Sequence, residues 1–128
     1  MISDKRVCPV LIVEDDGDLC RILVAMLTKI CPVHVEHDLH SAESYLTKRI
    51  PVIILMDNNL PDGLGVDKIK SILDLHPQIK IVLMTADLSE GLKEKAIHDG
   101  AVRFITKPFR ATAIRDLLLA VCPDLRAA

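Results

Sequence analysis

The chain has 128 residues, half of them hydrophobic and 27% charged, which suits one soluble globular domain with a single core. Its formal net charge of −2 argues against the basic surface that nucleic-acid or anionic-membrane binding requires. The N-terminal apolar run is too short, and too soon followed by Glu14, for a secretory signal or a membrane-spanning helix, so we expect a cytoplasmic protein.

Five short apolar segments predict β-strands. They cover residues 10–13, 33–35, 52–56, 79–84 and 102–105. The third and fourth consist almost entirely of valine, isoleucine, leucine and methionine, which is typical of strands covered by helices on both faces.

The stretches between these strands carry apolar residues at steps of three and four, which predicts helices. The helical periods fall at residues 19–30, 41–48, 69–75, 88–97 and 114–121. Ile22 belongs to the first stripe, Leu88 and Ile97 belong to the fourth, and Gly100 follows as an expected C-terminal cap. Alternating strands and helices predict right-handed crossovers and a parallel sheet between two helix layers.

Chemically active residues follow the predicted strands. Glu14, Asp15 and Asp16 come after the first, Asp57 after the third, Thr85 and Ala86 after the fourth, and Lys107 and Pro108 after the fifth. In an open parallel sheet, ligands bind beyond the carboxyl ends of the strands. We therefore expect these groups to meet at one edge.

Carboxylates gathered at one edge repel, by about 4 kcal/mol for two unit charges roughly 4 Å apart at an effective dielectric near 20. A bound cation relieves that repulsion, and a few carboxylates with open positions suit Mg²⁺. Lys107 can contact a phosphate as a point charge, and the Thr85 hydroxyl can donate a hydrogen bond.

Each piece alone has an ordinary explanation. An acidic run after a strand is commonly a solvated turn or a helix cap, and we expect Asp16 to cap a helix and not to bind metal. A single strand-end aspartate is often structural, and Lys-Pro is often part of a loop. Their joint occurrence after separate strands is what favours a site.

Four segments, at residues 10–16, 53–63, 81–86 and 100–109, resemble those of the receiver domain of bacterial two-component response regulators. The resemblance covers essentially the whole chain. It implies an α/β, flavodoxin-like three-layer sandwich with a five-stranded parallel sheet of order 2-1-3-4-5, as in the chemotaxis member of this family. It also implies one receiver domain over residues 1–128 with no output domain.

The resemblance assigns a role to each site residue. Asp57 corresponds to the phosphoacceptor. Mg²⁺, with Mn²⁺ as an alternative ion, would be held by Asp15, Asp57, the backbone carbonyl of Asn59 and, through water, Glu14. Thr85, Ala86, Lys107 and Phe104 correspond to the phosphate-binding and switch residues, and the bond before Pro108 is expected to be cis.

The implied function is that of a signalling switch and not of an enzyme with an external substrate. A sensor histidine kinase or a phosphotransfer protein would donate the phosphoryl group, and the chain would catalyse only its own phosphorylation and dephosphorylation. The response would change a face built from helix 88–97, strand 102–105 and helix 114–121. That face would bind an unknown protein target or a second copy of the chain, with no direct role for nucleic acid or a membrane.

Of four alternative functions, two lack their signature residues in this sequence and two remain open at this stage. A haloacid-dehalogenase-type enzyme needs a second aspartate where Asn59 stands, and a dinucleotide-binding domain needs a glycine-rich turn where Glu14 stands. A module that keeps the fold without using phosphate, or a receiver cut from a longer protein, would share these motifs. Phe104 replaces the more usual tyrosine, so it either packs passively or switches without a hydroxyl.

The cysteines and the spaced histidines suggest no further site. Because no C-x-x-C pair occurs, we expect Cys8, Cys20, Cys31 and Cys122 to be buried reduced thiols. His34, His37 and His40 straddle a predicted strand end and a loop, and we expect them on the solvated surface.

Overall fold

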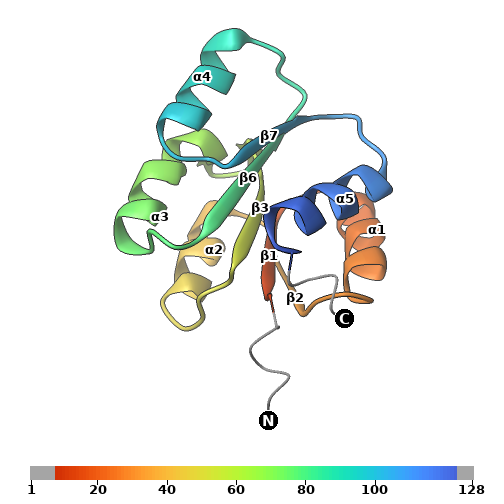
Figure 1. Cartoon of the computed structure of the whole chain (residues 1–128). Helices are drawn as coiled ribbons and strands as arrows, with labels where there is room; N and C mark the ends of the chain where they lie inside the picture. The colour runs from red at the N-terminus through yellow and green to blue at the C-terminus, as the bar shows by residue number, and fades with distance from the viewer. Residues whose placement is uncertain (1–7, 124–128) are drawn as a thin grey trace.

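The computed structural model describes residues 8–123, which alternate between strands and helices along the chain (Figure 1). The elements are β1 (Val10–Val13), α1 (Gly17–Leu27), β2 (Val33–Glu36), α2 (Leu39–Leu46), β3 (Ile53–Asp57), β4 (Asn59–Leu60), β5 (Gly63–Leu64), the 3₁₀ helix η2 (Gly65–Lys68), α3 (Ile69–Leu75), β6 (Lys80–Thr85), α4 (Glu90–His98), β7 (Arg103–Thr106) and α5 (Ala111–Val121).

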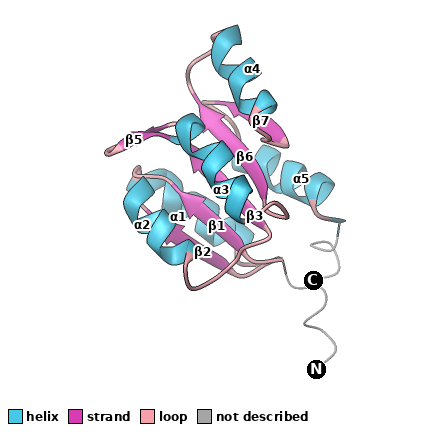
Figure 2. Ribbon diagram, turned by 90° about the vertical axis from the view of Figure 1, so that its left-hand side faces the viewer, coloured by secondary structure: helices cyan, strands magenta, loops and turns pink. Residues whose placement is uncertain are grey.

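The main sheet has the order β2-β1-β3-β6-β7, and all of its neighbouring strands are parallel. Since β6 and β7 are the fourth and fifth strands of this sheet, the expected order 2-1-3-4-5 is confirmed. The short strands β4 and β5 form a separate antiparallel hairpin directly after β3 (Figure 2).

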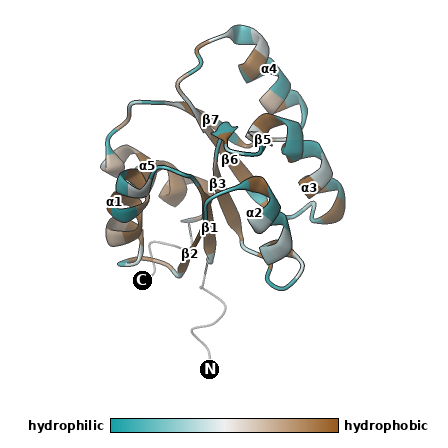
Figure 3. Cartoon of the chain, turned by 180° about the vertical axis from the view of Figure 1, so that it is seen from behind, coloured by the Kyte–Doolittle hydropathy of each residue, from teal (hydrophilic) through white to brown (hydrophobic). Residues whose placement is uncertain are grey.

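Helices cover both faces of the sheet, and alternate residues of each central strand serve the two faces. On one side α1 and α5 pack against a core that includes Ile12 and Leu55. On the other side α2, α3 and α4 pack against a core that includes Leu11 and Ile54 (Figure 1). The hydropathy view shows the resulting pattern, with hydrophobic central strands and helices that carry both kinds of residue (Figure 3). The predicted two-layer coverage is confirmed.

Side-chain caps fix where the first two helices begin. Asp16 caps α1 by accepting hydrogen bonds from the amides of Asp18 (3.0 Å) and Leu19 (3.2 Å), as the sequence predicted. Asp38 caps α2 by accepting from the Ser41 amide at 2.7 Å. This cap starts α2 at Leu39, earlier than the apolar pattern alone indicated.

Some residues of the predicted apolar stripes face solvent instead of the core. Ile22 is 54% exposed, Leu88 is 75% exposed and lies before α4, and Ile97 is 47% exposed. Gly100 follows the C-cap of α4 and has φ +116°, a conformation that favours glycine. Within residues 8–123, no helix combines the length and hydrophobicity needed to cross a bilayer.

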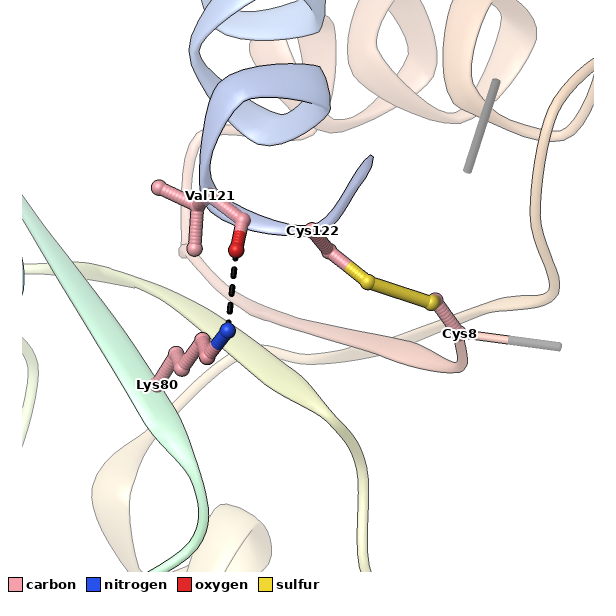
Figure 4. Close-up of a disulfide and its surroundings, with 4 residues drawn as sticks. All are labelled: Cys8, Lys80, Val121 and Cys122. Carbon is pink, nitrogen blue, oxygen red and sulfur yellow. Dashed lines mark hydrogen bonds between the residues drawn. A yellow bond between two sulfur atoms is a disulfide. The ribbon is translucent and has the colours of Figure 1, made fainter. Parts of the chain in front are cut away.

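The expectation of four reduced thiols is wrong for two of them. Cys8, before β1, and Cys122, after α5, form a disulfide between the two ends of the described chain (Figure 4). Beside it, Lys80 Nζ donates a hydrogen bond to the Val121 carbonyl at 2.9 Å. Cys20 and Cys31 are free and buried as expected, and burial raises the pKa of each thiol to about 11. The pairing was missed because the two cysteines are 114 residues apart and only the fold brings them together.

Reduction of the Cys8–Cys122 disulfide should destabilise the protein. We expect a strong reductant to lower the free energy of unfolding by about 2–4 kcal/mol, because the cross-link restricts the unfolded chain. Chemical denaturation with and without reductant measures this difference. The double variant Cys8→Ser, Cys122→Ser is the control and should not respond to reductant. Detection of all four thiols in denatured, unreduced protein would contradict the assignment.

Candidate functional site

The carboxyl ends of neighbouring strands bring the predicted site residues together. Val13 of β1 is paired with Met56 of β3, so the residues that follow them, Glu14 and Asp57, lie side by side. Asp57 is in turn paired with Met84 of β6. The register of a parallel sheet therefore places two acidic side chains at adjacent strand ends.

Lys107 joins these two carboxylates. Its Nζ lies 2.7 Å from Glu14 Oε1 and 3.0 Å from Asp57 Oδ1. The Lys107 amide donates to the Thr85 carbonyl at 2.7 Å, and the Lys107–Pro108 bond is cis, as expected. The segment after β7 is thus held against the end of β6, with its ammonium group directed into the acidic cluster.

Asp15 completes a cluster of three carboxylates with Glu14 and Asp57. One oxygen from each lies within 4.8 Å of the other two. Glu14 and Asp57 are buried, with 1% and 5% of their surface exposed, whereas Asp15 is exposed. The cluster therefore has a buried floor and one side open to solvent.

The electrostatics of the cluster show an excess of negative charge. Burial raises the pKa of Glu14 and of Asp57 above their ordinary values, and the contacts with Lys107 only partly offset this effect. Burial acts to lower the pKa of Lys107. The contacts with Glu14 and Asp57 act in the opposite direction and outweigh burial, so the pKa of Lys107 is raised overall. Lys107 therefore stays protonated, and its single ammonium group faces a cluster of three acids.

This donor set fits a hard divalent cation. Carboxylate oxygens, an open side and uncompensated negative charge are the features that favour Mg²⁺ over softer metals. Asn59 begins the hairpin two residues after Asp57, and its segment is held by the Asn58 amide, which donates to the Met84 carbonyl at 2.8 Å. The backbone carbonyl of Asn59 is thus placed in the loop that adjoins the cluster.

Of the predicted switch residues, Thr85 and Ala86 lie at the same edge, whereas Phe104 lies within β7 and pairs with Leu83. Thr85 is fully buried at the end of β6, and its Oγ1 accepts a hydrogen bond from the Asp87 amide at 3.0 Å. Phe104 is half-buried in β7 and packs against the core on the α2–α4 side. A pocket of about 390 Å³ adjoins the cluster, lined by Asp16, Leu19, Ala86, Lys107, Pro108 and Phe109.

The structure also adds residues that sequence reasoning missed. His34, His37 and His40 are exposed, as expected. His37 also forms a hydrogen bond, because its Nδ1 lies 2.9 Å from the carbonyl oxygen of Glu14 and must carry the proton. Cys20 Sγ donates to the same carbonyl at 3.3 Å. Asn58 is buried, and its Oδ1 accepts from the Val66 amide at 3.0 Å. No sequence motif marks these contacts, which depend on how the segments after β1 and β3 fold.

His34 also forms contacts that were not expected. Its ring stacks on Tyr45 with the ring centroids 4.0 Å apart, and its Nε2 lies 2.6 Å from Glu36 Oε2. This group lies on β2 and α2, apart from the acidic cluster.

Comparison with known proteins agrees with what the fold and the site geometry indicate. Residues 10–119 match the family described as "Response regulator receiver domain". The chain is 30% identical over 112 residues to chemotaxis protein CheY of Thermotoga maritima, covering 85% of this chain and 92% of that protein. It is 34% identical over 101 residues to transcriptional regulatory protein CitB of Klebsiella pneumoniae, covering 77% of this chain but only 43% of CitB.

A solved structure is also similar to this chain. The beryllofluoride-activated NtrC4 receiver domain dimer superposes with a TM-score of 0.80 at 28% identity, covering 93% of this chain and 97% of that one. The similarity to CitB spans less than half of that relative, whereas the similarity to CheY spans nearly all of it.

Removal of one buried charge should stabilise the metal-free protein. The raised pKa means that folded Asp57 holds its proton more tightly than the unfolded chain, so ionising it costs stability as the pH rises through that pKa. In Mg²⁺-free buffer near neutral pH, Asp57→Asn should raise the unfolding midpoint by a few degrees, since about 1 kcal/mol moves it by roughly 4 °C. Thermal unfolding measures the change.

The pH dependence separates this cause from others. The gain from Asp57→Asn should shrink as the pH is lowered toward the ordinary aspartate pKa of 3.8, because protonation removes the same charge from the wild type. Asp74→Asn on α3, whose side chain is 67% exposed, serves as the control and should show no such gain. A gain of the same size at every pH would contradict the electrostatic origin.

Proposed function

The chain belongs to the family of response regulator receiver domains, and we propose that it is a phosphorylation switch in which Asp57 accepts a phosphoryl group from a phosphohistidine. The donor would be a sensor histidine kinase or a phosphotransfer protein. The chain would then act on no external substrate and would catalyse only its own phosphorylation and dephosphorylation.

The observation that carries this proposal is the shared contact of Lys107 with Glu14 and Asp57, 2.7 Å and 3.0 Å from its Nζ. A lysine in this position compensates the carboxylates before transfer and can contact phosphoryl oxygens after it. A purely structural ion pair would need one acid and not a cluster of three that is open to solvent on one side.

The proposed step uses the Asp57 oxygen that Lys107 does not hold. This oxygen attacks the phosphorus, an O–P bond forms, and the P–N bond to the histidine of the donor breaks. The electron pair of that bond returns to the imidazole, which leaves as a neutral ring when its other nitrogen carries a proton. Lys107 would stabilise the charge on the transferred oxygens. The position of Asp57 at the end of the buried strand β3 fixes the nucleophile beside Lys107.

Asp15, Asp57, the Asn59 carbonyl and, through water, Glu14 would hold Mg²⁺. The ion would neutralise charge on the phosphoryl oxygens during transfer. Support for this assignment comes from the oxygen-only donor set and from the raised pKa values that burial imposes on Glu14 and Asp57.

The response would pass through Thr85 and Phe104. A phosphoryl group adds charge and acceptor oxygens, to which the Thr85 hydroxyl and the Ala86 amide could donate. Movement of Thr85 would alter the space beside Phe104 in the adjacent strand β7 and thereby the face formed by α4, β7 and α5. Because the NtrC4 receiver is a dimer in its activated form, we propose a second copy or a protein target for this face.

Phosphorylation with a small donor tests the proposal directly. Incubation with acetyl phosphate and Mg²⁺ should add one phosphoryl group, visible by intact-mass analysis, and Asp57→Ala or EDTA should abolish the gain. Lys107→Ala should slow the reaction roughly a hundredfold, the typical cost of losing one charge-stabilising donor. Asp74→Ala, which removes an exposed aspartate, is the matched control and should react like the wild type. An unchanged mass in the wild type would exclude the proposed function.

A further inference from the structure

The loop that follows Asp57 is held at its base and at its turn. We call residues 58–65 the metal loop, because it carries the Asn59 carbonyl. At its base the Gly65 amide donates to the Asn58 carbonyl at 2.7 Å. Gly65 is needed there, since a Cβ atom would lie 2.4 Å from the Asp57 carbonyl oxygen. Hydrogen bonds of the β4–β5 hairpin connect this base to the turn at residues 60–63.

At the turn of the loop, the Asp62 carboxylate binds the N-terminus of α2. Its Oδ1 accepts from the Leu39 amide at 2.8 Å and its Oδ2 from the His40 amide at 2.9 Å. Both oxygens of one carboxylate are thus used on two consecutive amides of a helix 22 and 23 residues away in sequence. These bonds hold the pKa of Asp62 below its ordinary value, so the carboxylate is ionised at neutral pH.

Asp62 shares the start of α2 with a second acid. Asp38, the N-cap of the same helix, accepts from the next amide, that of Ser41, at 2.7 Å. The first three backbone amides of α2 are therefore all hydrogen-bonded to aspartate side chains, which come from two different segments of the chain. Asp38 belongs to the helix itself, whereas Asp62 belongs to the metal loop.

Apolar contacts reinforce the connection made by Asp62. Leu60 in the loop is 8% exposed and belongs to the same core as Leu39, the first residue of α2. A Cβ atom on Gly63 would lie 3.1 Å from Leu39 Cδ1, so the turn approaches the helix closely. The loop is docked on α2 by packing and oriented there by the two hydrogen bonds of Asp62.

We propose that Asp62 is a positioning residue for the cation site, which fixes the metal loop, and with it the Asn59 carbonyl, against the N-terminus of α2. The inference rests on the proposed function, because it concerns the same Mg²⁺. Asp62 itself does not touch the ion and acts through the loop. By linkage, a cation that orders the loop must strengthen the contacts of Asp62 with α2 to the same extent.

The first test compares Mg²⁺ affinity among three variants by NMR titration of ¹⁵N-labelled protein. Asp62→Ala should weaken Mg²⁺ binding roughly three- to tenfold. Loss of a group that directly orients a metal ligand typically costs about ten- to hundredfold, and Asp62 acts less directly, through the loop. Asp62→Asn keeps an acceptor oxygen and loses the charge, so its loss should be smaller. Asp38→Ala removes a cap from the same helix without touching the loop, and its affinity should stay within about twofold of the wild type.

Each alternative has its own result. If Asp62→Asn weakens binding as much as Asp62→Ala, the effect is the charge alone and the inference is wrong. If Asp38→Ala weakens it equally, the effect is the stability of α2 and the inference is wrong. If the wild type binds Mg²⁺ and Asp62→Ala binds it equally well, the inference fails while the proposed function stands. A wild type with no Mg²⁺-dependent shifts overturns the proposed function and this inference with it.

The second test needs no variant. Amide hydrogen exchange in the wild type should slow at Leu39 and His40 when Mg²⁺ is added, because their acceptor is in the metal loop. The Ser41 amide, bound to Asp38, is the internal control and should change less. Equal responses at the three amides would overturn the inference.

Discussion

Three carboxylates that share a single ammonium group are the constraint on which the rest of this structure depends. Glu14, Asp15 and Asp57 come within 4.8 Å of one another, and Lys107 contacts two of them. Such a group is unfavourable in a buried setting, and the raised pKa values of Glu14 and Asp57 show that cost. The scaffold must hold these charges together against their repulsion, and any cation that enters relieves it.

The sheet supplies that rigidity. The central strands β3 and β6 are buried, with Leu55 and Leu83 fully enclosed between the two helix layers. Because the parallel register fixes where each strand ends, Glu14 and Asp57 cannot separate without breaking the ladder. The loops beyond the strand ends are secured separately, as shown by His37 and its hydrogen bond to the Glu14 carbonyl. Backbone geometry thereby contains the repulsion that the single Lys107 ammonium group leaves uncompensated.

The sequence predicts the parts of this arrangement that follow from local pattern. The apolar runs locate the strands, and the position of Asp57 after such a run places it at the sheet edge. Contacts between segments far apart in the chain carry no local signal. Cys8 and Cys122 meet only because the fold joins the two ends of the described chain, and Asp62 reaches α2 only because a short hairpin turns it there. The exposure of Ile22 shows a further limit, since helical period does not say how far an apolar stripe extends into the core.

Charge balance also links the phosphoryl group and the divalent cation of the proposed mechanism. Before transfer, Lys107 compensates both Glu14 and Asp57. If Lys107 turns toward a phosphoryl oxygen, Glu14 is left buried with less compensation, and the phosphoryl group adds negative charge of its own. In the proposed mechanism, a divalent cation held by the same acids would supply the positive charge that Lys107 gives up. The phosphoryl group and the cation should therefore favour each other's binding, because each removes the electrostatic cost that the other would face alone.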